Sequence, residues 1–156
     1  MPSASTWLQI QQDCKMLLAA AKLPGINGVV VQKMSSIKEG ISLKIPVIVI
    51  SPYGDPESEP LDFEGGGNNI YPVEVCVIAA NNLDLSPDDQ QQGWLEATRR
   101  ALLRNPDSSF RATLPNVSSV WDVNEETAAT FDRSKLSSQY SYQSIIVRFH
   151  CNERTN

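Results

Sequence analysis

The segment Tyr71-Pro72-Val73-Glu74-Val75-Cys76-Val77-Ile78-Ala79-Ala80 decides the fold of this chain of 156 residues. Apolar side chains occupy every second position from Tyr71 to Ala79. Successive side chains of a β-strand point to opposite faces of a sheet, so these positions share one face. The other face mixes Glu74 with apolar residues. The segment is therefore predicted to be a strand whose uniformly apolar face meets the core.

Further strands are predicted on both sides of this segment. Residues 29–31 are three valines, and residues 42–51 carry Ile and Val on both faces. Pro46 cannot donate a ladder hydrogen bond, so it indicates either an edge strand or the first residue of a strand. Toward the C-terminus, strands are predicted over residues 117–123 and 140–151, where apolar and partly polar positions alternate.

Two helices are predicted from three- and four-residue apolar spacing. The first runs from a cap at Ser5 to Leu23-Pro24-Gly25. The second begins at Ser86-Pro87, where Asp88 and Asp89 favour the positive helix end, and it stops at Asn105-Pro106. Its apolar stripe consists of Trp94, Leu95, Thr98, Ala101 and Leu102.

The order of these elements indicates an α+β fold. Helices are few, and the strands are not separated by regular helical crossovers. We expect a mixed or antiparallel β-sheet with the two main helices packed on one face. A chain of this length fits one domain, so residues 1–156 are predicted to share one core.

Residues 52–69 are predicted to form a long exposed acidic loop. This stretch contains three prolines, the triplet Gly65-Gly66-Gly67 and five acidic residues, without hydrophobic periodicity. Its carboxylates could bind Ca²⁺ or Mg²⁺, but they lack the ligand order of an EF-hand. The glycine triplet lacks the Lys and Ser or Thr of a phosphate-binding loop. Loops of this length in a compact domain usually bind a partner or stay flexible.

Charge is distributed unevenly along the chain, whose net charge is −5. Residues 1–51 carry five Lys and two acidic residues, whereas residues 52–89 carry nine acidic residues and no Lys or Arg. A nucleic-acid footprint would need clustered Lys and Arg, which this pattern does not provide. Opposite charges in different parts of one molecule favour head-to-tail contact between copies.

No catalytic, cofactor or metal site is predicted. His150 is the one histidine, and no nucleophile motif such as GxSxG accompanies it. Cys14, Cys76 and Cys151 lack metal-ligand or CxxC spacing, so buried free thiols are expected. No apolar run reaches the length of a membrane span, and no secretory signal pattern stands at the N-terminus, so a cytoplasmic product is expected.

The order of the predicted elements resembles that of one protein family. The segments that carry the resemblance are Ile45-Pro46-Val47-Ile48-Val49-Ile50, Tyr71-Pro72-Val73-Glu74-Val75, the Trp94-Leu95-Glu96 helix and the closing strand 142–150. It is similar to the tail-terminator and tail-completion proteins of long-tailed bacteriophages, small subunits at the head-to-tail joint. The resemblance implies a homo-oligomeric ring, usually sixfold, that caps the tail tube and joins it to the neck or connector. Further implications are a possible contact with a tail sheath, passage of genomic DNA without specific binding, and a virion protein assembled in the host cytoplasm.

The expected function is therefore structural, without enzymatic activity. The alternatives are a head-completion subunit, a tail-tube subunit, or a small carboxylate-dependent hydrolase. Candidate interface residues come from the acidic stretch and from separate basic positions. They are Tyr53, Asp55, Glu57, Glu59, Asp62, Phe63, Glu64, Lys33, Lys38, Lys44, Arg133 and Lys135. Some of the acidic residues of 55–64 or 84–89 are expected to face the channel or a basic neighbour.

Overall fold

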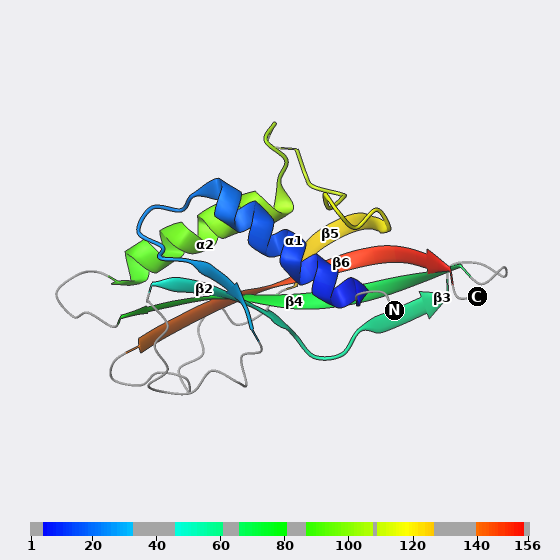
Figure 1. The fold of residues 1–156 in the computed structure, drawn as a ribbon, viewed down its shortest axis with the longest axis horizontal. Coiled ribbons are helices and arrows are strands. Elements are labelled where there is room, and N and C mark those ends of the chain that lie inside the picture. The colour runs from blue at the N-terminus through cyan, green and yellow to red at the C-terminus, as the bar shows by residue number, and fades with distance from the viewer. Residues whose placement is uncertain are drawn as a thin grey trace.

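The computed structural model describes residues 5–32, 46–60, 66–80, 87–107, 109–126 and 140–154. These residues form two helices and a six-stranded mixed sheet, with both helices on one side of the sheet (Figure 1). The predicted α+β class and the placement of both helices on one face are confirmed.

The sheet is organised around two long central strands. β4 (Gly66–Ala80) and β6 (Tyr140–Arg154) pair antiparallel over their full length, from Gly66↔Arg154 to Ala80↔Tyr140. The strand order is β1-β2-β4-β6-β5, and β3 also pairs with β4. The remaining strands are β1 (Val29–Val31), β2 (Val47–Pro52), β3 (Glu57–Pro60) and β5 (Val120–Glu126). β1 is parallel to β2, and the other pairs are antiparallel.

The main core lies between the sheet and the helices α1 (Thr6–Ala21) and α2 (Pro87–Leu103). Alternate residues of the central strands supply its floor, as the two-residue period predicts, and Phe149 is the largest fully buried side chain. Val47, Val49, Cys76 and Ile78 form a smaller cluster, and their register places them on the opposite sheet face. All three cysteines are buried free thiols, as expected.

Two tryptophans fix the helices through hydrogen bonds as well as packing. Trp7 Nε1 donates to Pro72 O at 2.9 Å, which ties α1 to β4. Trp94 Nε1 donates to Pro24 O at 2.8 Å, which ties α2 to the segment after α1. The N-terminus of α1 follows the sequence signal, because Ser5 Oγ accepts from Leu8 N at the N-cap. Its last residue is Ala21, just before the predicted Leu23-Pro24-Gly25, and Lys22 takes the left-handed conformation at the C-cap.

The predicted loop over residues 52–69 is wrong in part. Glu57–Pro60 form β3, and β4 begins at Gly66 instead of Tyr71. The residues of β3 have weak intrinsic strand propensity. They form a strand because their backbone pairs with the edge of β4, whose backbone groups would otherwise lack partners. Residues 61–65 lie outside the described part.

Two other strand boundaries also differ. The strand predicted over 117–123 is observed over Val120–Glu126, because Val120 N donates to Val117 O in a turn that precedes it. β5 extends to Glu126 because the backbone of its polar residues also pairs with β6. Pro46 immediately precedes β2, and β2 lies between β1 and β4, so Pro46 marks the start of an interior strand.

A buried carboxyl group connects α1 to the segment that precedes β5. Asp13 is 3% exposed; its Oδ2 accepts from Asn116 N at 2.9 Å and its Oδ1 accepts from Asn116 Nδ2 at 2.8 Å. These contacts cross a sequence separation of 103 residues. Asp13 therefore fixes the approach to β5 against the helix layer.

We expect Asp13→Ala to lower the free energy of unfolding by about 1.5–3 kcal/mol, the usual contribution of hydrogen bonds to a charged group. Urea denaturation measures this difference. Gln12→Ala, at the exposed neighbouring position of α1, is the control and should change stability little. Equal effects of the two substitutions would contradict the role given to Asp13.

The buried Cys14 thiol should make the free energy of unfolding depend on pH in the alkaline range. Burial, reinforced by the charge of Asp13, raises the pKa of the Cys14 thiol far above its ordinary value of 9.0. Above pH 9 the unfolded thiol loses its proton while the folded thiol retains it. The free energy of unfolding should therefore fall by up to about 1.4 kcal/mol per pH unit from this group. Cys14→Ala should remove that slope, and parallel pH curves for the two proteins would refute the prediction.

Candidate functional site

Four of the predicted interface residues lie in or beside a turn at the sheet edge. Tyr53, Asp55 and Glu57 belong to residues 52–57, named here the edge turn, and Glu59 lies in β3. The other predicted interface residues lie outside the described part. They are Asp62, Phe63, Glu64, Lys33, Lys38, Lys44, Arg133 and Lys135.

The edge turn projects because the chain leaves the β4 ladder and then returns to it. Tyr53 N donates to Pro72 O at 3.1 Å, which is the last contact after β2. Gly54 then adopts a φ of 61°, and β3 resumes pairing at Glu57↔Ile70. In Figure 1 this turn passes along the lower margin of the molecule. Tyr53 is 43% exposed, and Asp55 is also exposed.

The return to the ladder is fixed by an ion pair. Glu57 Oε2 accepts from Arg148 Nη2 at 2.8 Å, which links β3 to β6 across β4. The Glu57 carboxylate side chain is 60% exposed, so solvent screening reduces its contribution to stability. Its geometric effect is to hold one end of the edge turn. Asp55 remains as the outward-facing carboxylate of the turn.

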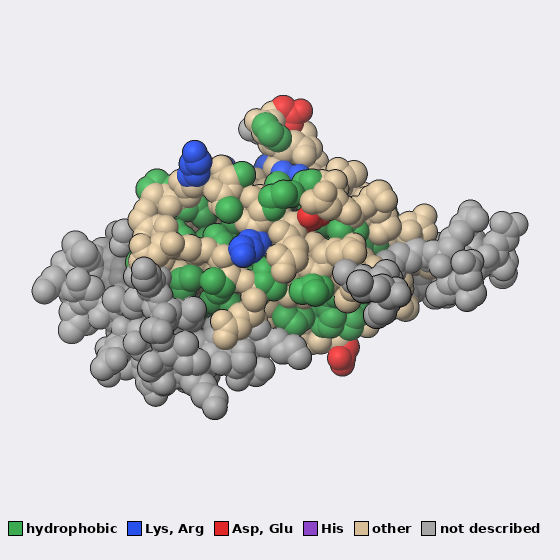
Figure 2. Space-filling model, in the orientation of Figure 1, with side chains coloured by type: hydrophobic (Ala, Val, Ile, Leu, Met, Phe, Trp, Pro, Cys, Tyr) green, Lys and Arg blue, Asp and Glu red, His purple; other side chains and the backbone are tan. Residues whose placement is uncertain are grey.

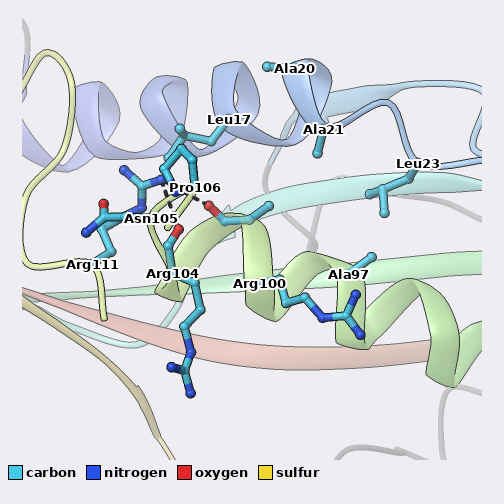
Figure 3. A pocket seen from close by; sticks show the side chains of 11 residues that line it. Leu17, Ala20, Ala21, Leu23, Ala97, Arg100, Arg104, Asn105, Pro106 and Arg111 are labelled. Atoms are coloured by element: carbon cyan, nitrogen blue, oxygen red, sulfur yellow. Dashed lines mark hydrogen bonds between the residues drawn. The ribbon is translucent and has the colours of Figure 1, made fainter. Parts of the chain in front are cut away.

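A groove lies between the C-terminal halves of the two helices (Figure 3). Its volume is about 770 Å³. Side chains of α1, α2 and the segments that follow them form an apolar floor. Arg100 of α2 and Arg104, which follows α2, form one rim. The apolar lining consists of Leu17, Ala20, Ala21, Leu23, Ala97, Ala101 and Pro106. Arg100 extends along α2 toward Ala97, and Asn105 and Arg111 lie at one end.

The end of the groove is held by a braced loop over residues 104–111. Arg111 Nη2 donates to Ala101 O at 3.4 Å and to Arg104 O at 3.2 Å, which satisfies carbonyls at the end of α2. Its buried Nε has no hydrogen-bond partner among the described residues. The Arg104 guanidinium stacks on Phe110 at 4.0 Å, although Phe110 is 71% exposed. Hydrogen bonds from Ser109 lower the pKa of Asp107 within this loop.

A polar cluster missed from the sequence surrounds His150. Asn68 Nδ2 lies 3.1 Å from His150 Nδ1, and Asn124 Nδ2 lies 3.1 Å from His150 Nε2. Trp121 Nε1 donates to Asn68 Oδ1 at 3.2 Å, and its ring meets the imidazole edge. The cluster joins β4, β5 and β6, so its observed contacts are structural. A bulge in β5 at Trp121 makes this geometry, and the two-residue period gives no sign of it.

Exposed charges are distributed unevenly over the described surface, although Glu96 of α2 and Asp107 after it are exposed beside the cations of the helix layer. Lys15, Lys22, Arg100 and Arg104 are exposed on or just after the helices, whereas Asp55 and Glu57 lie at the edge turn. Figure 2 shows hydrophobic side chains spread over the helix-bearing face, an acidic group at the lower margin, where the edge turn passes, and another acidic group at the upper margin. The groove and the edge turn are thus two chemically different surfaces.

Some ligand classes can be checked against the described residues. Within those ranges, no group of three or more His, Cys, Asp and Glu side chains has an arrangement that could hold a metal ion. None of the helices in the described ranges combines the length and apolar character that crossing a membrane requires. The chain matches no protein-family model and no curated protein sequence.

Gly54→Ala should lower the free energy of unfolding by about 1–2 kcal/mol, because a residue with a side chain is strained in the left-handed region. Gly28→Ala is a matched control, since Gly28 has no positive φ and nothing lies within 4 Å of an added Cβ. That control should leave stability unchanged or raise it by up to about 1 kcal/mol. Urea denaturation compares the two, and an equal or smaller loss for Gly54→Ala would show that the turn does not require glycine.

Proposed function

We propose that this protein is a structural subunit that assembles with copies of itself into a ring of the bacteriophage tail-terminator type. The ring caps the tail tube and joins it to the neck, and genomic DNA passes through without specific binding. The protein acts by recognition and carries out no reaction. It resides in the virion after assembly in the host cytoplasm.

One observation carries the proposal: the described exposed cations gather at the helix layer, where Glu96 and Asp107 are also exposed, and exposed carboxylates stand at the lower margin (Figure 1). The exposed cations Lys15, Lys22, Arg100 and Arg104 lie with the helix layer, and Asp55 and Glu57 lie at a sheet edge. A ring requires a heterologous contact, in which one patch of a subunit meets a different patch of its neighbour. Opposite charge also steers such patches toward each other and disfavours contact between like patches.

The fold supplies a rigid frame for such contacts. The fifteen-residue pairing of β4 with β6 and the helix layer fix the distance between the edge turn and the helices. Partners with preformed surfaces lose little conformational entropy when they associate.

This proposal is favoured over a carboxylate-dependent hydrolase by the setting of the described acidic side chains. Glu57 is held by Arg148 at 2.8 Å, and Asp55 projects from an exposed turn. General acid–base catalysis needs carboxyl groups that converge on one substrate. A projecting carboxylate is instead suited to contact with a basic partner surface.

The test is the mass and shape of the purified protein. Multi-angle light scattering and negative-stain imaging should show a closed ring, with six copies expected from the resemblance. Open tubes of stacked rings would instead identify a tail-tube subunit. Added tail tubes of the same phage should bind the ring at their ends; binding only to portal complexes would identify a head-completion subunit. A monomer at every accessible concentration, with no binding to tubes or portals, would refute the proposal.

A further inference from the structure

We propose that the groove between α1 and α2 receives the edge turn of a second copy of this chain. Tyr53 of one subunit enters the apolar floor of its neighbour, and Asp55 meets the arginines at the rim. This inference rests on the proposed ring assembly and names the contact that builds it.

The groove has room for an inserted side chain because its floor is made of small residues. Four alanines from the two helices face this region: Ala20, Ala21, Ala97 and Ala101. Its volume of about 770 Å³ falls within the range of sites that bind ligands or side-chain anchors. An aromatic ring placed there would bury apolar surface on both partners, which is the main favourable term in association.

The edge turn has the properties of a preorganised anchor. Tyr53 stands between Pro52 and Gly54, and Pro56 follows Asp55. The two prolines restrict the backbone, and the hydrogen bond from Tyr53 N to Pro72 O fixes the turn to β4. Tyrosine is enriched at binding hot spots because it buries a large area at a low cost in side-chain entropy. Its exposure of 43% leaves much of the ring available.

The rim of the groove and the edge turn carry charges of opposite sign, which favours contact between them. The Arg100 side chain is 76% exposed, and its observed salt bridge to Glu96 is long, at 3.9 Å, and exposed. Arg104 stands one helical turn further on and is also exposed. A carboxylate such as Asp55 can accept two parallel hydrogen bonds from a guanidinium group. The described residues that line the groove include no Asp or Glu, so among these residues the incoming carboxylate meets cationic and neutral groups.

The positions of the two surfaces favour a head-to-tail chain of contacts. In Figure 1 the edge turn passes the lower margin, whereas the C-terminal end of α2 and the loop after it lie at the upper margin. One subunit therefore cannot fill its own groove with its own turn. A contact between different patches closes into a ring when the rotation between neighbours is suitable. A second copy is the proposed occupant because this chain itself carries the complementary turn.

The experiment uses two defective variants of the full chain. Ala20→Glu with Arg100→Glu blocks the groove, and Tyr53→Ala with Asp55→Lys removes the anchor. Each should weaken self-association by at least about 30-fold, as measured by analytical ultracentrifugation. The controls are Gln12→Glu with Thr113→Glu and Ser118→Glu, and Glu126→Lys with Leu8→Ala. Their substitutions are at exposed positions outside both surfaces and change net charge by the same amounts, so assembly should remain unchanged. Circular dichroism checks that all variants fold.

A mixture of the two defective variants tests the proposed contact directly. A groove-blocked copy keeps its edge turn, and an anchor-deficient copy keeps its groove, so an equimolar mixture should form heterodimers and nothing larger. Rings from either variant alone would overturn the groove contact while leaving the proposed function standing. Two assembly-deficient variants that form no heterodimer would also overturn it. A wild-type protein that stays monomeric would remove both the contact and the self-assembly on which it rests.

Discussion

The backbone pairing of β4 with β6 over fifteen residues is the constraint on which the rest of the structure depends. Its register sets Tyr71 opposite Phe149, Val73 opposite Val147 and Val75 opposite Ile145, so both strands present apolar side chains to the helices. A slip of one residue would turn these side chains to the opposite face. The other strands add to this pair: β2 and β3 along one side of β4, and β5 along the free side of β6.

The edge turn follows from how β2 and β3 share one side of β4. Pro52 ends β2, and its missing N–H means that it cannot donate to the ladder. Gly54 adopts a left-handed conformation where the chain leaves the ladder, and Arg148 then holds Glu57 as β3 begins in the same direction as β2. The intervening residues are pushed away from the sheet edge. A local irregularity in a long strand pairing thus produces an outward-facing tyrosine and carboxylate on a rigid support.

The sequence predicts those parts of the fold that a local period determines. The alternation in β4 and β6 and the helical stripe through Trp94 and Leu102 all lie where their patterns indicate. β3 could not be found in this way, because Glu57–Pro60 become a strand through the partner that β4 provides. Of the residues predicted to form an interface, only Tyr53, Asp55, Glu57 and Glu59 lie within the described ranges, and their role in an interface stays a prediction. The sequence did not predict the groove, because alanines on two different helices form it. The small size of these alanines is the one signal in the sequence that the helices could leave a groove between them.

The separation of charge along the sequence acquires a physical meaning once the helices are docked. Arg100 of α2 and Arg104 just after it place cations beside an apolar groove, and the β2–β3 connection places an anion and an aromatic ring elsewhere on the surface. In a closed ring every subunit uses both surfaces, so n subunits make n identical contacts, one more than an open chain of the same length. The last contact forms within one assembly, where the effective concentration of the two surfaces is high. In the proposed ring, a contact of modest strength between two copies can therefore be sufficient for a stable assembly.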